Sequence, residues 1–164
     1  MRALAAAAAA AAALAIALAG CGDGASAPDA AATARATVPL TIVSGGRRHA
    51  FAVEVAATPE AQQRGLMYRT HIPADGGMLF APYPAGADGK AGGARVASFW
   101  MKNTPSALDI IFIRPDRTIA NIEADTLPFS EAPVSSSEPV TAVLELRGGR
   151  AAELGIAPGD RVAW

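Results

Sequence analysis

Residues 98–113 read SFWMKNTPSALDIIFI, and this stretch combines residue types that are rare in the rest of the chain. The 164-residue sequence has only two lysines, two asparagines and two tryptophans, and Trp100, Lys102 and Asn103 account for three of these six residues. Most of the remaining sequence is rich in alanine, glycine, arginine and proline. Against that background, the cluster indicates that these three positions are occupied for the chemistry of their side chains.

The same stretch predicts two β-strands joined by a turn. The turn falls at 103–105, because asparagine is a natural turn former and the residue before a proline is pushed toward extended geometry. The run Leu108–Ile113 that follows is rich in β-branched and aromatic residues, which is typical of a strand. In that strand Asp109 shares its face with Ile111 and Ile113, because side chains alternate between the two faces.

Asp109 therefore lies among apolar neighbours, where burying its charge without a partner would be costly. One interpretation is that Asp109 caps the turn at the edge of the sheet. The other is that Asp109 lies in one polar pocket with Lys102, which is the nearest cation in the sequence. Trp100 or the connector 125–139 would border that pocket, which would then be a ligand site.

Outside this stretch, short apolar runs separated by glycine and proline turns predict a mainly β domain, a sandwich or a barrel, with one or two short helices. Thr58, Pro59 and Glu60 form a helix start that Gly65 can end. Glu145 is predicted to lie on the outward face of its strand. Glu54 is also predicted to lie on an outward face, and the alternative is that it pairs with an arginine in a groove. Further strands are predicted at 38–43, 49–56, 78–81, 118–123, 142–146 and 161–164, and one helical turn at 150–154.

Arg64 lies in the last turn of the first helix, and Arg69 follows in a loop. They are either structural or solvated, or they rim the pocket and hold an anionic group, for which the fork of guanidinium donors is suited. The predicted ligand-binding residues are therefore Trp100, Lys102, Asn103, Asp109, Arg64 and Arg69.

Seven segments, in a fixed order, cover nearly all of residues 38–164: FAVEV (51–55), TPEAQQRGLMYR (58–69), GMLF (77–80), FWMKNT (99–104), LDIIFI (108–113), VLEL (143–146) and GIAPGD (155–160). This pattern resembles the domain-of-unknown-function family number 192 (DUF192), a bacterial and archaeal family without an assigned activity. The resemblance implies a single compact domain of mainly β structure, similar to a β-sandwich or jelly roll, and it implies no reaction. The Gly/Ala/Pro-rich stretch 81–94 departs from the family by its greater length.

The N-terminal part of the chain is typical of a bacterial lipoprotein. Residues 1–20 have a short positive start and an apolar run, which predicts a secretory signal. This run ends in the sequence LAGC at Leu18–Cys21, which resembles the bacterial lipobox, with cleavage before Cys21 and lipidation of that residue. A plain signal peptide or a membrane-spanning anchor is the alternative. The lipoprotein interpretation places the protein on the periplasmic side of a membrane, and Gly22 after the lipidated residue favours the outer membrane.

Residues 21–37 are small and polar to alanine-rich and are predicted to be a disordered tether, which leaves 38–164 as one β domain. Removal of residues 1–20 leaves 13 basic and 15 acidic side chains, a balance that argues against a nucleic-acid partner. Once Cys21 is lipidated no thiol remains, and neither His49 nor His71 has a metal-ligand spacing. The sequence thus predicts no metal site and no cofactor, and a monomer.

Three functions remain open, since none of the common catalytic motifs is present. The first is a non-enzymatic, lipid-anchored module that binds a small polar ligand or cell-wall fragment around Trp100, Lys102, Asn103 and Asp109. The second is a structural or accessory envelope protein. The third is an envelope hydrolase that uses Asp109 and Glu54 as an acid–base pair.

Overall fold

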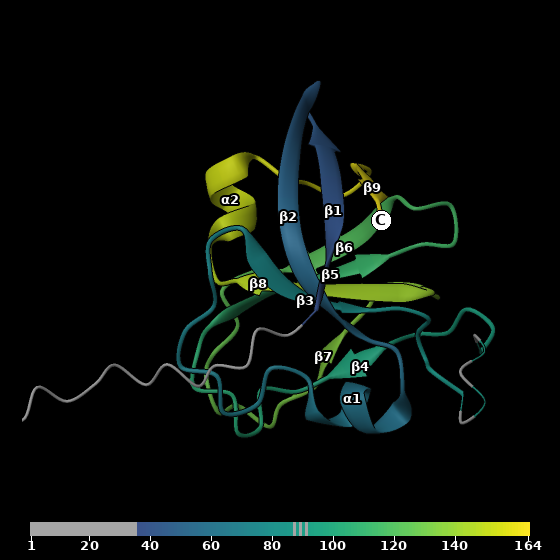
Figure 1. Cartoon of the computed structure of the whole chain (residues 1–164), viewed down its shortest axis with the longest axis vertical. Helices are drawn as coiled ribbons and strands as arrows, with labels where there is room; N and C mark the ends of the chain where they lie inside the picture. Colours follow the sequence, from purple (N-terminus) through teal and green to yellow (C-terminus); the bar gives the residue numbers. More distant parts are fainter. Residues whose placement is uncertain (1–35, 87, 89, 91) are drawn as a thin grey trace, which may run out of the picture. The chain divides into compact units, whose positions relative to one another are not determined.

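The computed structural model describes residues 36–86, 88, 90 and 92–164. This part of the chain forms nine strands and two short helices (Figure 1), so the predicted mainly β single domain with one or two short helices is confirmed. In chain order the elements are β1 (Thr37–Ser44), β2 (Arg47–Ala56), α1 (Pro59–Arg64), β3 (Gly76–Phe80), β4 (Ser98–Phe99), β5 (Leu108–Ile113), β6 (Ile119–Glu123), β7 (Val134–Ser135), β8 (Ala142–Arg147), α2 (Arg150–Leu154) and β9 (Arg161–Ala163).

Seven of the strands form one sheet in the order β6-β5-β8-β3-β2-β1-β9. Neighbouring strands are antiparallel except for β2 and β3, which are parallel and are connected through α1. A single bridge between Thr118 and Arg161 joins the two ends of the sheet, so that the sheet nearly closes. The architecture is thus a nearly closed sheet with a separate two-stranded sheet, β4–β7, beside it.

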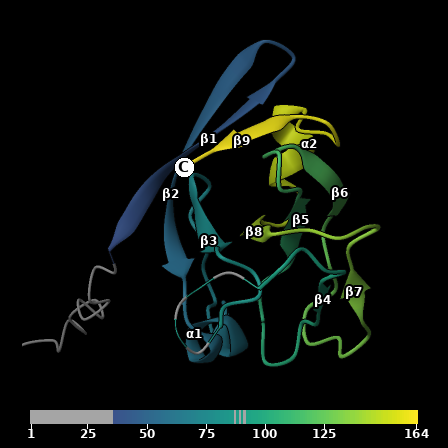
Figure 2. The ribbon, with the colours of Figure 1, turned by 90° about the vertical axis from the view of Figure 1, so that its right-hand side faces the viewer.

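The sheet is covered on both faces. On one face, residues such as Leu79, Ile111 and Leu144 belong to one buried cluster, which α2 joins through Ala151. On the other face, Phe80 and Phe112 belong to a second cluster, and α1, β4 and β7 lie at that end of the domain (Figures 1 and 2). Because β5 and β8 are buried on both faces, their sequences are nearly continuous apolar runs.

The helix boundaries follow the capping chemistry of the sequence. The Thr58 side chain accepts a hydrogen bond from the Ala61 amide at 3.2 Å, Pro59 begins α1, and Gly65 ends it with φ of +47°. Helix α2 ends at Gly155, which is also left-handed. No helix in the described part of the chain is long and apolar enough to cross a membrane.

The predicted signal 1–20 and the lipidated Cys21 lie outside the described residues. So does the predicted tether 21–37 up to residue 35, whereas Thr37 already begins β1.

Candidate functional site

A cavity of about 500 Å³ lies between α1 and the segments around β4. We call it the Glu145 hollow, after the acid that lines it from the sheet. Four aromatic residues contribute to its lining: Phe80, Tyr83, Phe99 and Trp100. Arg64, Gln63 and Glu131 add polar groups to its lining.

Glu145 is the most unusual residue of the hollow. Its side chain comes from β8, and its partners in register are Met78 on β3 and Ile110 on β5, so both lateral neighbours are apolar. Glu145 is only 5% exposed, and its Oε2 atom has no hydrogen-bond partner among the described residues. Burial raises the pKa of the Glu145 carboxyl from 4.5 to about 8, which keeps it a neutral acid at pH 7.

The prediction that Glu145 faces outward was wrong. The outward face of β8 is covered by the second buried cluster, which includes Val143 of β8, Phe80 and Ala97. An alternation rule assigns the polar residue of a strand to solvent only when one face of the sheet is exposed. Here both faces are buried, so the acid lies within the protein.

Gly65 packs closely against Phe80 beside the buried Glu145 carboxyl. A Cβ atom at this position would lie 3.2 Å from the Phe80 ring and 3.8 Å from the Oε2 atom of Glu145. Gly65 also has φ of +47°, which L-residues rarely adopt. The same glycine that ends α1 therefore lies where any side chain would crowd the Phe80 ring next to the acid.

Ring packing fixes the position of Phe99. Its ring lies edge-on to Phe80 at 5.1 Å between centroids and to Phe112 at 6.1 Å, and it is tilted against Tyr83 at 5.4 Å. Such arrangements are favourable beyond the area that they bury. The aromatic wall is therefore built into the second buried cluster and does not depend on a ligand.

Gln62 ties the helix to the opposite edge of the hollow. Its Nε2 donates to the carbonyl oxygens of Ala56 and Pro82, at 3.0 and 2.6 Å, and its Oε1 accepts from the Ala85 amide at 3.0 Å. The amide of Gln62 is therefore fully used within the protein. It holds the segment 82–85 in place as one rim of the hollow.

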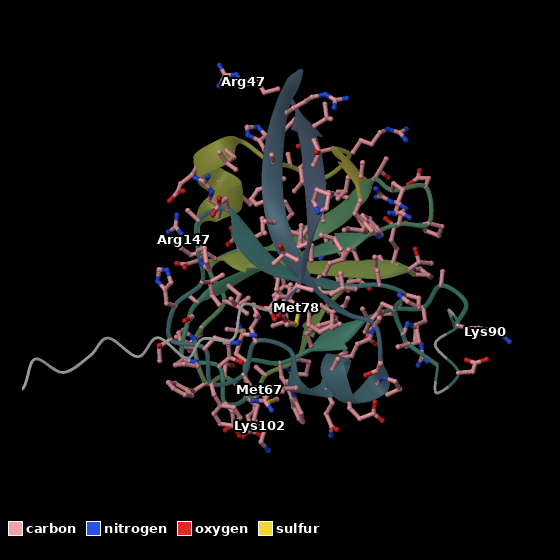
Figure 3. All side chains as sticks on the ribbon, viewed as in Figure 1. Arg47, Met67, Met78, Lys90, Lys102 and Arg147 are labelled. Atoms are coloured by element: carbon pink, nitrogen blue, oxygen red, sulfur yellow. The ribbon has the colours of Figure 1, made fainter. Side chains whose placement is uncertain are left out.

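A second hollow of about 550 Å³ adjoins the first and shares Gln63, Arg64, Met67 and Trp100 with it. We call it the Lys102 hollow; its further lining residues are Glu60, Lys102 and Asn103. Figure 3 shows Met67 and Lys102 at the same end of the domain as α1.

Of the six predicted ligand-binding residues, Trp100 and Arg64 line both hollows, and Lys102 and Asn103 line the second. Trp100 is 48% exposed, and the Lys102 ammonium lies 5.3 Å from the centroid of its ring. The same ammonium lies 3.8 Å from the Glu131 carboxylate. Asn103 is left-handed, and its carbonyl accepts from the Tyr68 amide at 2.7 Å, which confirms the predicted turn.

Asp109 lies elsewhere, and the predicted cluster of Asp109 and Lys102 is not formed. Asp109 is fully buried, and its Oδ1 accepts hydrogen bonds from the amides of Asp125 and Gly149 at 2.8 and 2.9 Å. Its Oδ2 accepts from the Ala151 amide at 2.7 Å. Several backbone donors, rather than a cation, thus stabilise this carboxylate.

Arg69 lines neither hollow. Its guanidinium makes two hydrogen bonds, both 2.9 Å, with the Glu54 carboxylate, and its carbonyl accepts from the Ser106 hydroxyl at 2.7 Å. Glu54 lies in the same cross-sheet row as Glu145, whereas Asp109 lies on the opposite face. The Asp109–Glu54 pair required by the hydrolase hypothesis is therefore not assembled.

The sequence argument missed Glu145 and the aromatic wall. The signal was present, because Glu145 lies in the apolar run VLEL just as Asp109 lies in LDIIFI. The principle that a buried acid needs a partner applies to both residues. In the structure Asp109 has three donors, whereas one oxygen of Glu145 has none among the described residues.

Comparison with known proteins identifies relatives over nearly the whole described domain. The model of DUF192, described as "Uncharacterized ACR, COG1430", matches residues 40–164. The structure is similar to that of a protein of unknown function from Novosphingobium aromaticivorans DSM 12444, with a TM-score of 0.72 and 41% identity over 82% of this chain and 89% of that chain. It is also similar to a protein of Sinorhizobium meliloti 1021 proposed to be a transcription regulator, with a TM-score of 0.70 and 40% identity over 79% and 94% of the two chains. Among curated proteins, none matches this chain.

Proposed function

Because the chain belongs to the DUF192 family, whose description names no activity, we propose its function from the site itself: it is a non-enzymatic module that binds a small organic ligand in the Glu145 hollow. The observation that carries this proposal is the buried Glu145 carboxyl, whose Oε2 has no partner among the described residues and which lines a cavity of about 500 Å³. A buried polar atom without a partner is costly unless a bound molecule supplies one.

The shape and lining of the hollow support a ligand with an apolar body. Small-molecule sites are concave and mostly apolar, with a few polar groups that fix the orientation of the ligand. Phe99 and Trp100 supply flat apolar surface here, and Glu145 supplies the deep polar contact.

The Lys102 hollow supports a second contact, with an anionic group of the same ligand. Lys102 and Arg64 both line it, and the Arg64 guanidinium makes no ion pair with any described residue. An exposed guanidinium without a carboxylate partner is suited to hold a phosphate or carboxylate.

We further propose that the module works in the bacterial envelope. The support is the sequence LAGC at Leu18–Cys21, which resembles a lipobox, and the apolar run before it. The membrane would be the partner of the acyl chains alone, and the ligand would be a small polar molecule or a cell-wall fragment. The mature charge of about −2 and the absence of a basic run support neither a nucleic-acid partner nor a charged membrane surface.

Fluorescence of Trp100 provides a direct test. The chain has only two tryptophans, and Trp164, which stacks against Arg117 at 3.4 Å, can be replaced by Trp164→Phe. This full-length variant, held in lipid nanodiscs, is titrated with phenyl compounds that carry ammonium, hydroxyl or phosphate groups and with N-acetylmuramoyl dipeptide. Saturable quenching by at least one probe is expected. Quenching by none at millimolar concentration would overturn the proposal.

The control is Gln63→Trp, which places a large side chain on the exposed face of α1 where both hollows meet. It should weaken the binding of any probe that occupies the Glu145 hollow. Because this variant adds a tryptophan, its binding is followed by the chemical shifts of the methyl groups that line the hollow. Binding that survives this substitution would place the ligand elsewhere.

A further inference from the structure

We infer, on the premise of the proposed function, that the ligand of the Glu145 hollow is an organic amine, whose ammonium group contacts the Oε2 atom of Glu145 and whose carbon skeleton lies against Phe99 and Trp100. Four features of the hollow lead to this ligand class: the unpartnered acid, the aromatic walls, the lack of unused polar groups at depth, and the lack of a side chain at Gly65.

The first feature is the surroundings of the acid. The lateral neighbours of Glu145 in the sheet are Met78 and Ile110, and burial alone acts on its pKa. No described cation is close enough to counter that effect. An ammonium group brought by a ligand would form the charge-assisted hydrogen bond that the protein does not provide, and such bonds are about twice as strong as neutral ones.

The second feature is the aromatic wall. Ring faces carry negative charge density and attract a cation within about 6 Å of their centroids. Phe80, Tyr83, Phe99 and Trp100 all line the hollow, and the Phe99 ring contacts those of Phe80 and Tyr83. The same rings offer apolar surface to the methylene groups of an alkyl or aryl amine.

The third feature argues against a sugar. A hydroxyl-rich ligand needs many polar partners, and the free polar side chains of the lining, such as Gln63 and Arg64, are exposed rather than deep. Both ends of the Gln62 amide are used within the protein, and the Thr104 hydroxyl already donates to the Lys102 carbonyl at 3.2 Å. Buried hydroxyls of a sugar would therefore remain unpaired at a free-energy cost.

The fourth feature is the lack of a side chain at Gly65, where a Cβ atom would lie 3.2 Å from the Phe80 ring and 3.8 Å from the Oε2 atom of Glu145. A small group can reach the buried acid from this side when the Phe80 side chain shifts. An ammonium group is small enough to do so and presents donors in several directions.

Binding has a defined proton balance. At pH 7 the Glu145 carboxyl is protonated, since its pKa is about 8. When an ammonium group arrives, the O–H bond of Glu145 breaks, its proton passes to solvent, and the carboxylate pairs with the ammonium. The affinity for an amine should therefore rise about tenfold per pH unit below that pKa and level off above it.

Other charged groups around Glu145 do not contribute to the shift of its pKa, which burial alone causes. Glu54, paired with Arg69, and Glu123 lie two strands away on either side in the same cross-sheet row. β3, β4 and β7 contribute no titratable group, and Asp109 of β5 lies on the opposite face. The titratable groups that line the hollow from α1 and the loops are Arg64, Tyr83 and Glu131.

The test compares two probes that differ only in the group presented to Glu145: 2-phenylethylamine and 2-phenylethanol. Full-length Trp164→Phe protein in nanodiscs is titrated with each at pH 6, 7 and 8. The amine is expected to bind at least about tenfold more tightly than the alcohol at pH 8, and its affinity should increase steeply with pH. Alcohol binding should change by less than about threefold over this range.

Variants test whether Glu145 causes the difference in affinity between the amine and the alcohol. Glu145→Gln keeps the shape and should weaken the amine at least about tenfold while leaving the alcohol within about threefold. Glu123→Gln, which removes an exposed carboxylate two strands away in the same cross-sheet row and outside the hollow, is the matched control and should leave both within about threefold. If Glu145→Gln fails to fold, titration calorimetry of the unsubstituted chain in two buffers of different ionisation enthalpy replaces it. Release of about one proton per amine at pH 7 is the expected result.

The outcomes separate this inference from the proposed function. Equal affinity for the two probes, or amine binding that does not depend on pH, would overturn the amine ligand and leave a binding hollow in place. If neither probe bound but the dipeptide or the phosphate probe did, the amine inference alone would fail. If no probe bound at all, both proposals would be wrong.

Discussion

Asp109 holds the start of helix α2 from 42 residues away: its Oδ2 atom accepts a hydrogen bond from the Ala151 amide at 2.7 Å. Gly149 stands at the N-cap of this helix and has no side chain to cap it, and its own amide donates to Oδ1 of the same carboxylate at 2.9 Å. A third donor, the Asp125 amide, completes the site at 2.8 Å. One buried carboxylate of β5 thus positions both the α2 start and the loop after β6.

This arrangement predicts a large stability loss in Asp109→Asn. The amide nitrogen that replaces one oxygen would face a backbone N–H, so two donors would meet and one would stay unsatisfied. We expect a loss of about 2–3 kcal/mol in the free energy of unfolding, measured by urea denaturation. Lys102→Met, which removes a half-exposed charge, should cost less than about 1 kcal/mol. A near-native stability of Asp109→Asn would show that the carboxylate is not needed as a cap.

The raised pKa of Glu145 predicts a specific dependence of stability on pH. The unfolded chain loses the Glu145 proton near pH 4.5, whereas the folded chain keeps it until about pH 8. Between these values the folded state binds the additional proton, so this residue lowers stability by about 1.4 kcal/mol per pH unit as the pH rises. Glu145→Gln removes the effect, and its stability relative to the original chain should rise steadily from pH 5 to pH 8. Parallel curves for the two proteins would contradict the buried neutral acid.

Gly77 allows β3 to approach β8 closely beneath the hollow. A Cβ atom at this position would overlap the carbonyl oxygen of Glu145 and lie 3.0 Å from the Leu146 side chain, and φ is +156°. Gly77→Ala should therefore cost about 3 kcal/mol or more, seen as a lowered urea midpoint. Gly93→Ala is the matched control: a Cβ there meets nothing within 4 Å, and stability should change by less than about 0.5 kcal/mol.

The two arginines of the segment 58–69 should separate binding from stability. Arg64→Met should leave the free energy of unfolding within about 0.5 kcal/mol, because this exposed guanidinium makes no ion pair in the described domain. It should weaken phenyl phosphate at least about threefold in the Trp100 fluorescence titration. Arg69→Lys breaks the two-pronged contact with Glu54 and should cost about 1 kcal/mol, with phenyl phosphate binding unchanged. If phenyl phosphate binding were instead weakened by Arg69→Lys and unchanged by Arg64→Met, the anion contact would lie at Arg69 and not in the Lys102 hollow.

The lipid anchor predicts a simple fractionation result. Cys21→Ser removes the residue that would be lipidated, so the chain should accumulate as an uncleaved precursor or a soluble secreted form. Metabolic labelling with a clickable palmitate analogue and extraction with detergent are the measurements. Full retention in the membrane fraction without label uptake would show that another segment provides the anchor.

Much of the fold follows from local chemistry that the sequence displays. Thr58 and Gly65 mark the ends of α1 because their capping and left-handed geometry depend only on neighbouring backbone. The strand Leu108–Ile113 follows in the same way from its β-branched and aromatic residues. Its side chains alternate between the two buried clusters, as the geometry of a strand requires. The turn at Asn103 and the short helix 150–154 belong to the same class of local prediction.

The closure of the sheet and the partners of the buried acids were decided only by tertiary contacts. The bridge of Thr118 with Arg161 joins segments 43 residues apart, and no local pattern encodes such a pairing. Sequence alone determined that Asp109 needed partners, and tertiary structure supplied backbone amides in place of Lys102. Sequence placed Glu145 at the surface, because alternation cannot tell which strands are covered on both faces. Burial is a property of the whole packed domain, and therefore only the assembled sheet, α1 and β4 could make Glu145 a buried acid beside an open hollow.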